Sequence, residues 1–272
     1  MDIGNLEHST LESFPNSNYV VSTQRVSKII LSNEPDDEMA LSEHIEEFSQ
    51  RLIFCFGVLA LITIACFTDI KDIVRIFQAP AIGIKFLQFA PGEYFFASIK
   101  IAAFCGILFS SPIILYQIFL YVVPGMTKKE RNIIVPGTLA AIILFGVGIL
   151  FSYFFLVPAA LKFFIAYGSD VVEPFWSFDQ YFDFLAVLIF TTGLVFQVPI
   201  VQVLLGISGI VTGEKMLSAW KYVIVMSTIV AAVVTPSTDP ITQLFLTGAL
   251  LALYLGGSSF VILLEKRMSL TE

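Results

Sequence analysis

Two long runs of residues that carry almost no charge lie on either side of one short, basic loop. Residues 94–123 contain a single charged side chain, Lys100, and residues 132–161 contain none. As a helix, each run is long enough to cross the roughly 30 Å hydrocarbon core of a bilayer. The loop between them is tethered to hydrocarbon on both sides, so it must lie at a membrane surface. This feature alone excludes an ordinary soluble fold.

The loop, residues 123–132, reads VPGMTKKERN and combines three cations with one carboxylate. Short basic loops remain on the side of the membrane where the protein is made, so Lys128, Lys129 and Arg131 predict that this loop lies inside. Glu130 is the exception, a single carboxylate beside three cations. On charge alone it could offset the positive charge of its neighbours and stabilise the start of the next helix, or it could bind a ligand.

Composition narrows the class of protein further. Hydrophobic residues make up 57% of the chain and charged residues 14%, against about 25% charged residues in soluble domains. The net charge of −7 argues against a nucleic-acid partner. The three cysteines lie far apart in apolar runs, and the two histidines, His8 and His44, lie outside them. We therefore expect no metal site and no zinc or serine–histidine catalysis inside the bilayer.

The chain divides into three predicted segments. Residues 1–39 form a polar tail that we expect to be disordered, without the features of a signal or transit peptide. Residues 40–264 form a membrane domain, and residues 265–272 a short C-terminal tail. The fold class is an all-α polytopic membrane protein with six transmembrane helices. The expected spans are residues 52–68, 94–123, 132–157, 181–205, 220–234 and 241–264, each to within a few positions.

An amphipathic helix is predicted before the first span. Its apolar residues recur at i, i+4, i+7 and i+11, which places them on one stripe; they are Leu41, Ile45, Phe48 and Leu52. Glu47 and Arg51 lie together on one flank of that stripe. We expect this helix to follow the membrane surface and to enter the bilayer at Arg51.

Three features modify the spans. Pro112 lies inside the second span, where it bends the helix and leaves a carbonyl that neighbours must satisfy. Gln197 lies in the fourth span, where an amide is costly unless it faces protein or water. It could make an interhelical hydrogen bond or belong to a site. The fifth span, residues 220–234, is too short at 1.5 Å per residue to cross the core, so it could thin the bilayer locally.

The basic residues predict that both termini lie inside. With that topology ten basic residues lie inside and five outside. The inside set is Arg25, Lys28, Arg51, Lys128, Lys129, Arg131, Lys215, Lys221, Lys266 and Arg267. The outside set is Lys71, Arg75, Lys85, Lys100 and Lys162.

Five motifs, in this order on six spans, resemble the TatC family, the receptor subunit of the twin-arginine protein translocase. They are HIEE at 44–47, SPIILYQ at 111–117, VPGMTKKER at 123–131, FQVP at 196–199 and TPSTDP at 235–240. The resemblance covers nearly everything except the N-terminal tail. The last motif and GEYFF at 92–96 resemble the cyanobacterial and plastid branch most.

The resemblance implies a concave six-helix bundle and a function without catalysis and without a cofactor, so the chain would not be an enzyme. Such a receptor binds twin-arginine signal peptides and assembles with TatA-like and TatB-like single-span partners. Copies of the receptor also associate with one another. It moves folded proteins using the proton-motive force. The membrane would be a plastid thylakoid or a cyanobacterial membrane, with both termini on the stromal or cytoplasmic side. By motif alignment, Glu47 and Glu130 are the carboxylates that bind the paired arginines.

The resemblance also assigns weaker roles. Arg131 and Tyr121 would support the binding loop, and Pro80 and Pro112 would set bends. Asp239 would lie in the far-side turn between the last two spans. Many bacterial relatives carry a glutamate where this chain has Gln197; we hypothesise that this glutamine contacts a polar residue of a partner helix.

Two other classes of protein fit the sequence less well than a receptor subunit. A secondary transporter of a small solute would require inverted repeats and ionisable groups at the midplane, and the sequence has neither in recognisable form. An intramembrane hydrolase would require histidine or paired-carboxylate chemistry that the spans lack. The transporter remains the alternative.

Overall fold

The computed structural model describes residues 41–81, 83–122, 128–168, 175–235 and 239–269. The predicted tail, residues 1–39, lies outside them. The chain divides into two compact units, Met1–Ser49 and Gln50–Glu272. The described part of the first unit is the beginning of helix α2 (Leu41–Thr68), so the amphipathic segment and the first span form one continuous helix.

The described residues are almost entirely helical, which confirms the predicted fold class. After α2 the helices are α3 (Ile70–Gln78), α4 (Glu93–Val122), α5 (Lys128–Phe151), the π-helical η2 (Ser152–Leu156), α6 (Val157–Gly168), α7 (Phe178–Val195), α8 (Val198–Ile207), α9 (Gly213–Ser218), α10 (Trp220–Val234) and α11 (Pro240–Ser269). Within the described ranges, five helical stretches are long and apolar enough to cross a membrane. The sixth apolar helix, α10, is shorter, as the sequence predicts.

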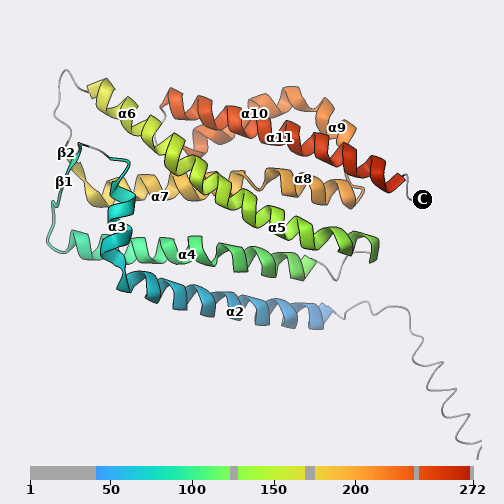
Figure 1. Cartoon of the computed structure of the whole chain (residues 1–272), viewed down its shortest axis with the longest axis horizontal. Coiled ribbons are helices and arrows are strands. Elements are labelled where there is room, and N and C mark those ends of the chain that lie inside the picture. The colour runs from blue at the N-terminus through green and yellow to red at the C-terminus, as the bar shows by residue number, and fades with distance from the viewer. Residues whose placement is uncertain (1–40, 82, 123–127, 169–174, 236–238, 270–272) are drawn as a thin grey trace, which may run out of the picture. The chain divides into compact units, whose positions relative to one another are not determined.

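In the second unit, the long helices lie side by side and alternate in direction (Figure 1). The end of α4, the start of α5, the end of α8, α9 and the end of α11 gather at one end, which we call the basic end. It carries Lys215, Lys266 and Arg267, and α5 begins there with Lys128. Helix α3 and the two strands lie at the opposite end, which we call the sheet end.

The sheet end contains a two-stranded parallel sheet that the sequence analysis did not anticipate. Strand β1 (Lys85–Leu87) pairs with β2 (Phe175–Ser177), with Phe86 opposite Trp176. Helix α3 is anchored beside it through the carbonyls of its last turn, which no helical N–H can reach. Tyr153 donates to the Ile76 carbonyl and Tyr181 to the Phe77 carbonyl, each at 2.7 Å.

Aromatic rings join α3 to α4 and α7. The ring centroids of Phe77, Phe104 and Phe182 lie 5.6–6.0 Å apart in tilted and edge-to-face arrangements. Such pairs contribute about 0.5–1.5 kcal/mol each beyond the area they bury. Leu185 and Ile189 on α7 are almost completely buried. Helix α7 is therefore the central helix against which the others pack.

Two helices depart from the expected span boundaries. The helix that contains residues 132–157 does not end there but continues through one π-helical turn into α6 as far as Gly168. A π turn accommodates the local change of backbone pairing before Pro158, which has no N–H to donate. The stretch 181–205 is interrupted at Gln197, where α7 ends and α8 begins. Pro199 then stands in the first turn of α8, a position that proline favours.

Candidate functional site

Glu47 lies in α2 and belongs to the first unit. Its side chain is half-buried, whereas those of its neighbours Glu46 and Phe48 are exposed. Of the two adjacent carboxylates, Glu47 is thus the one that the fold shields from solvent. Partial burial favours a carboxylate that pairs with a ligand, because its electrostatic interactions are less screened.

Glu130 is the third residue of α5 and belongs to the second unit. Its side chain, that of Arg131 and the loop at 123–127 lie outside the described residues. The helix start places the Glu130 backbone in the first turn of α5, where N–H groups without helical partners create a positive potential. That potential stabilises an ionised carboxylate at the basic end.

Arg51 and Gln117 join α2 to α4 near this end. The Arg51 guanidinium Nη1 donates to the Gln117 Oε1 at 2.7 Å across a partly buried contact. Tyr121, one turn further along α4, is half-buried. Close packing continues along the helix pair, because a Cβ on Gly106 would lie 2.0 Å from the Thr63 hydroxyl. The part of α2 from Arg51 onward is therefore fixed against the helix that leads into the basic loop.

The two predicted prolines lie after one helix and inside another. Pro80 lies in the turn that follows α3. Pro112 stands inside α4 and cannot donate to the Leu108 carbonyl four residues earlier. The Ser111 hydroxyl donates to that carbonyl at 2.6 Å instead. The group that the proline leaves unsatisfied is thus satisfied by the preceding side chain.

Gln197 and Asp239 both contact their own chain. The Gln197 side-chain Nε2 donates to the Ala141 carbonyl of α5 at 3.2 Å. Asp239 is 1% exposed, and its carboxylate accepts from the backbone N–H of Thr242 at 2.8 Å and from the Thr242 hydroxyl. This is the geometry of a helix N-cap, followed by a proline at the first helical position. Asp239 therefore starts α11.

The sheet end contains a charged cluster that was not predicted from the sequence. The Lys100 ammonium lies 2.9 Å from the Asp179 carboxylate and 3.1 Å from that of Asp183. The two aspartates are one turn apart on α7, where like charges repel, and one cation from α4 bridges them. Lys100 was the sequence signal for this cluster. A lysine that is the only charged residue in an apolar run needs an opposite charge nearby.

A second such contact centres on Glu93, the first residue of α4. Its Oε2 accepts from the N–H groups of Phe89 and Ala90 at 2.6 and 3.2 Å. Its Oε1 accepts from the Ser177 hydroxyl, which also caps α7. The Glu93 carboxylate thus joins the segment that follows β1 to the starts of α4 and α7.

The basic end is held mostly by neutral groups, with one carboxylate among them: the Gly213 N–H of α9 donates to the Glu265 carboxylate of α11 at 3.0 Å. The Gln202 amide of α8 donates to the Tyr254 carbonyl and the Ser258 hydroxyl of α11, at 3.2 and 2.9 Å. The Tyr254 hydroxyl donates to the Met216 carbonyl of α9 at 3.0 Å. Helices α8, α9 and α11 therefore form one rigid group. Nowhere in the described ranges do three or more His, Cys, Asp or Glu side chains come together as metal ligands would.

Residues 43–248 match the protein family described as Sec-independent protein translocase protein (TatC). The tatC-like protein ycf43 of Porphyra purpurea is 57% identical over 233 residues, 86% of this chain and 92% of that protein. The Sec-independent protein translocase protein TatC of Synechocystis is 49% identical over 237 residues, 87% of this chain and 93% of that protein. The chloroplastic TATC of Pisum sativum is 53% identical over 231 residues, 84% and 65% of the two chains.

A solved structure resembles this fold as well. The crystal structure of the twin arginine translocase receptor TatC superposes with a TM-score of 0.69 at 32% sequence identity. The match covers 82% of this chain and 99% of the other.

Proposed function

The chain belongs to the TatC family of twin-arginine translocase core subunits, and from that membership we propose that it binds twin-arginine signal peptides through Glu47 and Glu130. It is a multi-pass integral membrane protein of the plastid and cyanobacterial type and a transport component, not a catalyst. The observation that carries the proposal is the family match over residues 43–248, which includes both carboxylates.

The chemistry of the two positions supports this role. A guanidinium presents two parallel N–H donors that match the two oxygens of a carboxylate, whereas an ammonium presents a point charge. Hydrogen bonds to charged groups contribute about 1.5–3 kcal/mol each, or at least about tenfold in affinity for each pair. Two fixed carboxylates can therefore select paired arginines over paired lysines.

The wider assembly is part of the same proposal. The basic end faces the stroma or cytoplasm, where signal peptides arrive, so both termini lie on that side. TatA-like and TatB-like single-span proteins dock on the subunit, and subunits associate with one another. The proton-motive force drives transport. Gln197 contributes a polar contact to a partner helix through its amide oxygen, which has no hydrogen-bond partner among the described residues.

The decisive experiment measures binding of a twin-arginine signal peptide to the purified full chain, beside a peptide with both arginines changed to lysine. We expect arginine-selective binding that Glu47→Gln and Glu130→Gln each weaken by about tenfold or more. Glu46→Gln, beside Glu47, and Glu214→Gln, in α9, are matched controls that should bind like the unchanged protein. Equal binding of both peptides, unaffected by the two variants, would refute the proposal and favour the small-solute transporter.

The partner contact has its own test. Gln197→Leu should reduce crosslinking to a single-span partner while signal-peptide binding is retained. Unchanged crosslinking and transport would exclude the role of Gln197 without affecting the two carboxylates.

A further inference from the structure

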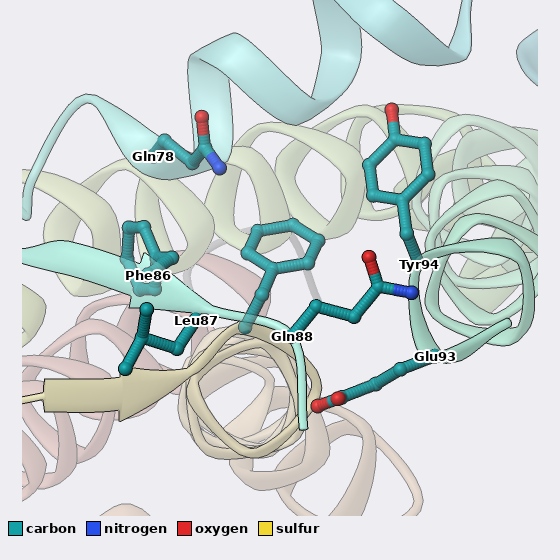
Figure 2. A pocket seen from close by; sticks show the side chains of 7 residues that line it. Gln78, Phe86, Leu87, Gln88, Glu93 and Tyr94 are labelled. Carbon is teal, nitrogen blue, oxygen red and sulfur yellow. The ribbon is translucent and has the colours of Figure 1, made fainter. Parts of the chain in front are cut away.

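A small cavity at the sheet end is not used by the proposed function. Its volume is about 170 Å³, space for roughly five or six waters at 30 Å³ each and comparable with one monosaccharide ring. It lies between the end of α3, strand β1 and the first turns of α4 and α7 (Figure 2). Its walls come from four segments that the contacts of Glu93 and Tyr181 hold in place. It is therefore a built feature of the fold.

Polar side chains that line this cavity have hydrogen-bonding capacity left over. Figure 2 shows Gln78 and Tyr94 on opposite sides of the space, with Gln88 between them. Within the described part of the chain, no group is hydrogen-bonded to the Gln78 side-chain amide or to the Tyr94 hydroxyl. The Gln88 Nε2 donates to the Ala90 carbonyl at 3.1 Å, which leaves its oxygen available. The cavity thus offers neutral donors and acceptors together.

The charge of the lining selects the class of ligand. No lysine or arginine lines the described wall of the cavity, so a phosphate or sulfate would meet the Glu93 carboxylate without a compensating cation. That carboxylate already accepts from three protein donors, which disfavours a cationic ligand as well. The remaining class is a neutral molecule with several hydroxyl groups, each able to donate and accept.

The apolar lining of the cavity and its surroundings indicate where such a ligand would come from. The rings of Phe86, Tyr94 and Phe178 line the cavity and can pack against the C–H faces of a sugar. Tyr94 is itself 44% exposed at the start of a membrane span, beside the exposed rings of Phe95 and Phe96. An exposed tyrosine at the end of a span marks the headgroup level of a bilayer, because its ring is apolar and its hydroxyl is polar. We propose that this cavity binds the neutral sugar headgroup of a membrane glycolipid.

Native mass spectrometry of the full chain in a polyoxyethylene detergent, which contains no sugar, tests the proposal. Monogalactosyldiacylglycerol, phosphatidylcholine and phosphatidylglycerol are added separately at equal concentration. We expect retention of the galactolipid at least several-fold above the other two. Gln78→Leu and Tyr94→Phe should each weaken that retention about three- to tenfold, as the loss of one hydrogen bond does. Tyr222→Phe removes a hydroxyl that is exposed at the other end of a span and should change nothing.

Three results would overturn the proposal. They are equal retention of the three lipids, retention that Gln78→Leu and Tyr94→Phe leave unchanged, and preferential retention of phosphatidylglycerol. Displacement of the galactolipid by millimolar free galactose would assign the cavity to a soluble sugar and overturn the lipid source. None of these outcomes depends on signal-peptide binding, which involves other residues and is measured separately.

Discussion

The two ends of the second unit are held together by different kinds of contact. At the sheet end, carboxylates and one lysine join segments that are far apart in sequence, as Lys100 joins Asp179 and Asp183. At the basic end, α8 and α11 approach so closely that a Cβ on Gly257 would lie 2.1 Å from the Gln202 Oε1. The bonds between them run between neutral groups.

This difference between the two ends shows where charged side chains stabilise the fold. Charges at the sheet end belong to the framework, so their removal should lower stability. The framework described at the basic end relies mostly on close packing and neutral hydrogen bonds. The exception is Glu265, which accepts from the Gly213 N–H. We expect the charges of Glu47, in the first unit, and Glu130 to serve a charged ligand, so their removal should affect binding and leave stability unchanged.

Gly257→Ala should have the largest effect on stability. The added methyl group would lie 3.0 Å from the Pro199 Cα and displace the Gln202 side chain, with loss of its two hydrogen bonds. We expect a loss of about 2–3 kcal/mol, measured as a lower melting temperature in detergent. Gly256→Ala is the matched control, since nothing lies within 4 Å of its Cβ position. Equal melting temperatures of the two variants would show that the basic end is not held by close packing.

Lys100→Met should have the next largest effect, because it leaves two aspartates repelling each other across one turn of α7. All three side chains are partly exposed, so we expect a loss of only about 1–2 kcal/mol. High salt should reduce the loss. Lys85→Met, an exposed lysine for which the described residues offer no ion pair, is the control. A loss of the same size in the control would mean that net charge, and not this cluster, is responsible.

Much of this fold could be predicted from the sequence, because membrane spans leave a strong signal. Long uncharged runs predicted the helices, and Pro112 predicted a carbonyl that a neighbour must satisfy, which the structure identifies as that of Leu108. The parallel pairing of β1 with β2 could not be predicted. Each strand has three residues, too few to show alternation, and two helical spans separate them along the chain.

The functional residues also differ in how far the sequence predicts them. Glu47 and Glu130 were identified by their motifs, which are local in sequence. The roles of Glu93 and Lys100 depend on partners 84 and 79 residues away, and no local pattern indicates such a distance. Asp239 was assigned to the turn before the last span, and only its bonds to Thr242 identify it as a helix cap.

Glu93→Ala should lower stability by less than Lys100→Met, because it removes the acceptor of two loop N–H groups and of the Ser177 hydroxyl. Its effect should be local: amide hydrogen exchange at Phe89 and Ala90 should accelerate, since both N–H groups lose their acceptor. Asp72→Ala removes a carboxylate at the same end whose ion pair with Arg75 is about three-quarters exposed, so it should have almost no effect. Unchanged exchange at Phe89 would contradict the role of Glu93 as the acceptor that holds this loop.

Glu47→Gln and Glu130→Gln should have the smallest effect on stability, within about 0.5 kcal/mol of the unchanged protein. Both substitutions keep the shape of the side chain and remove its charge. If that charge serves the ligand and not the framework, the melting temperature should stay constant while signal-peptide affinity falls about tenfold or more.

A structural variant at the same end completes this test. Gln117→Leu removes the acceptor of Arg51 and should lower stability by about 1–2 kcal/mol, because a partly buried guanidinium loses a hydrogen bond. Stability loss and affinity loss should therefore separate: the first in Gln117→Leu, the second in the two glutamate variants. If the glutamate variants melted as early as Gln117→Leu, their carboxylates would be part of the framework, and the basic end would be built on the same principle as the sheet end.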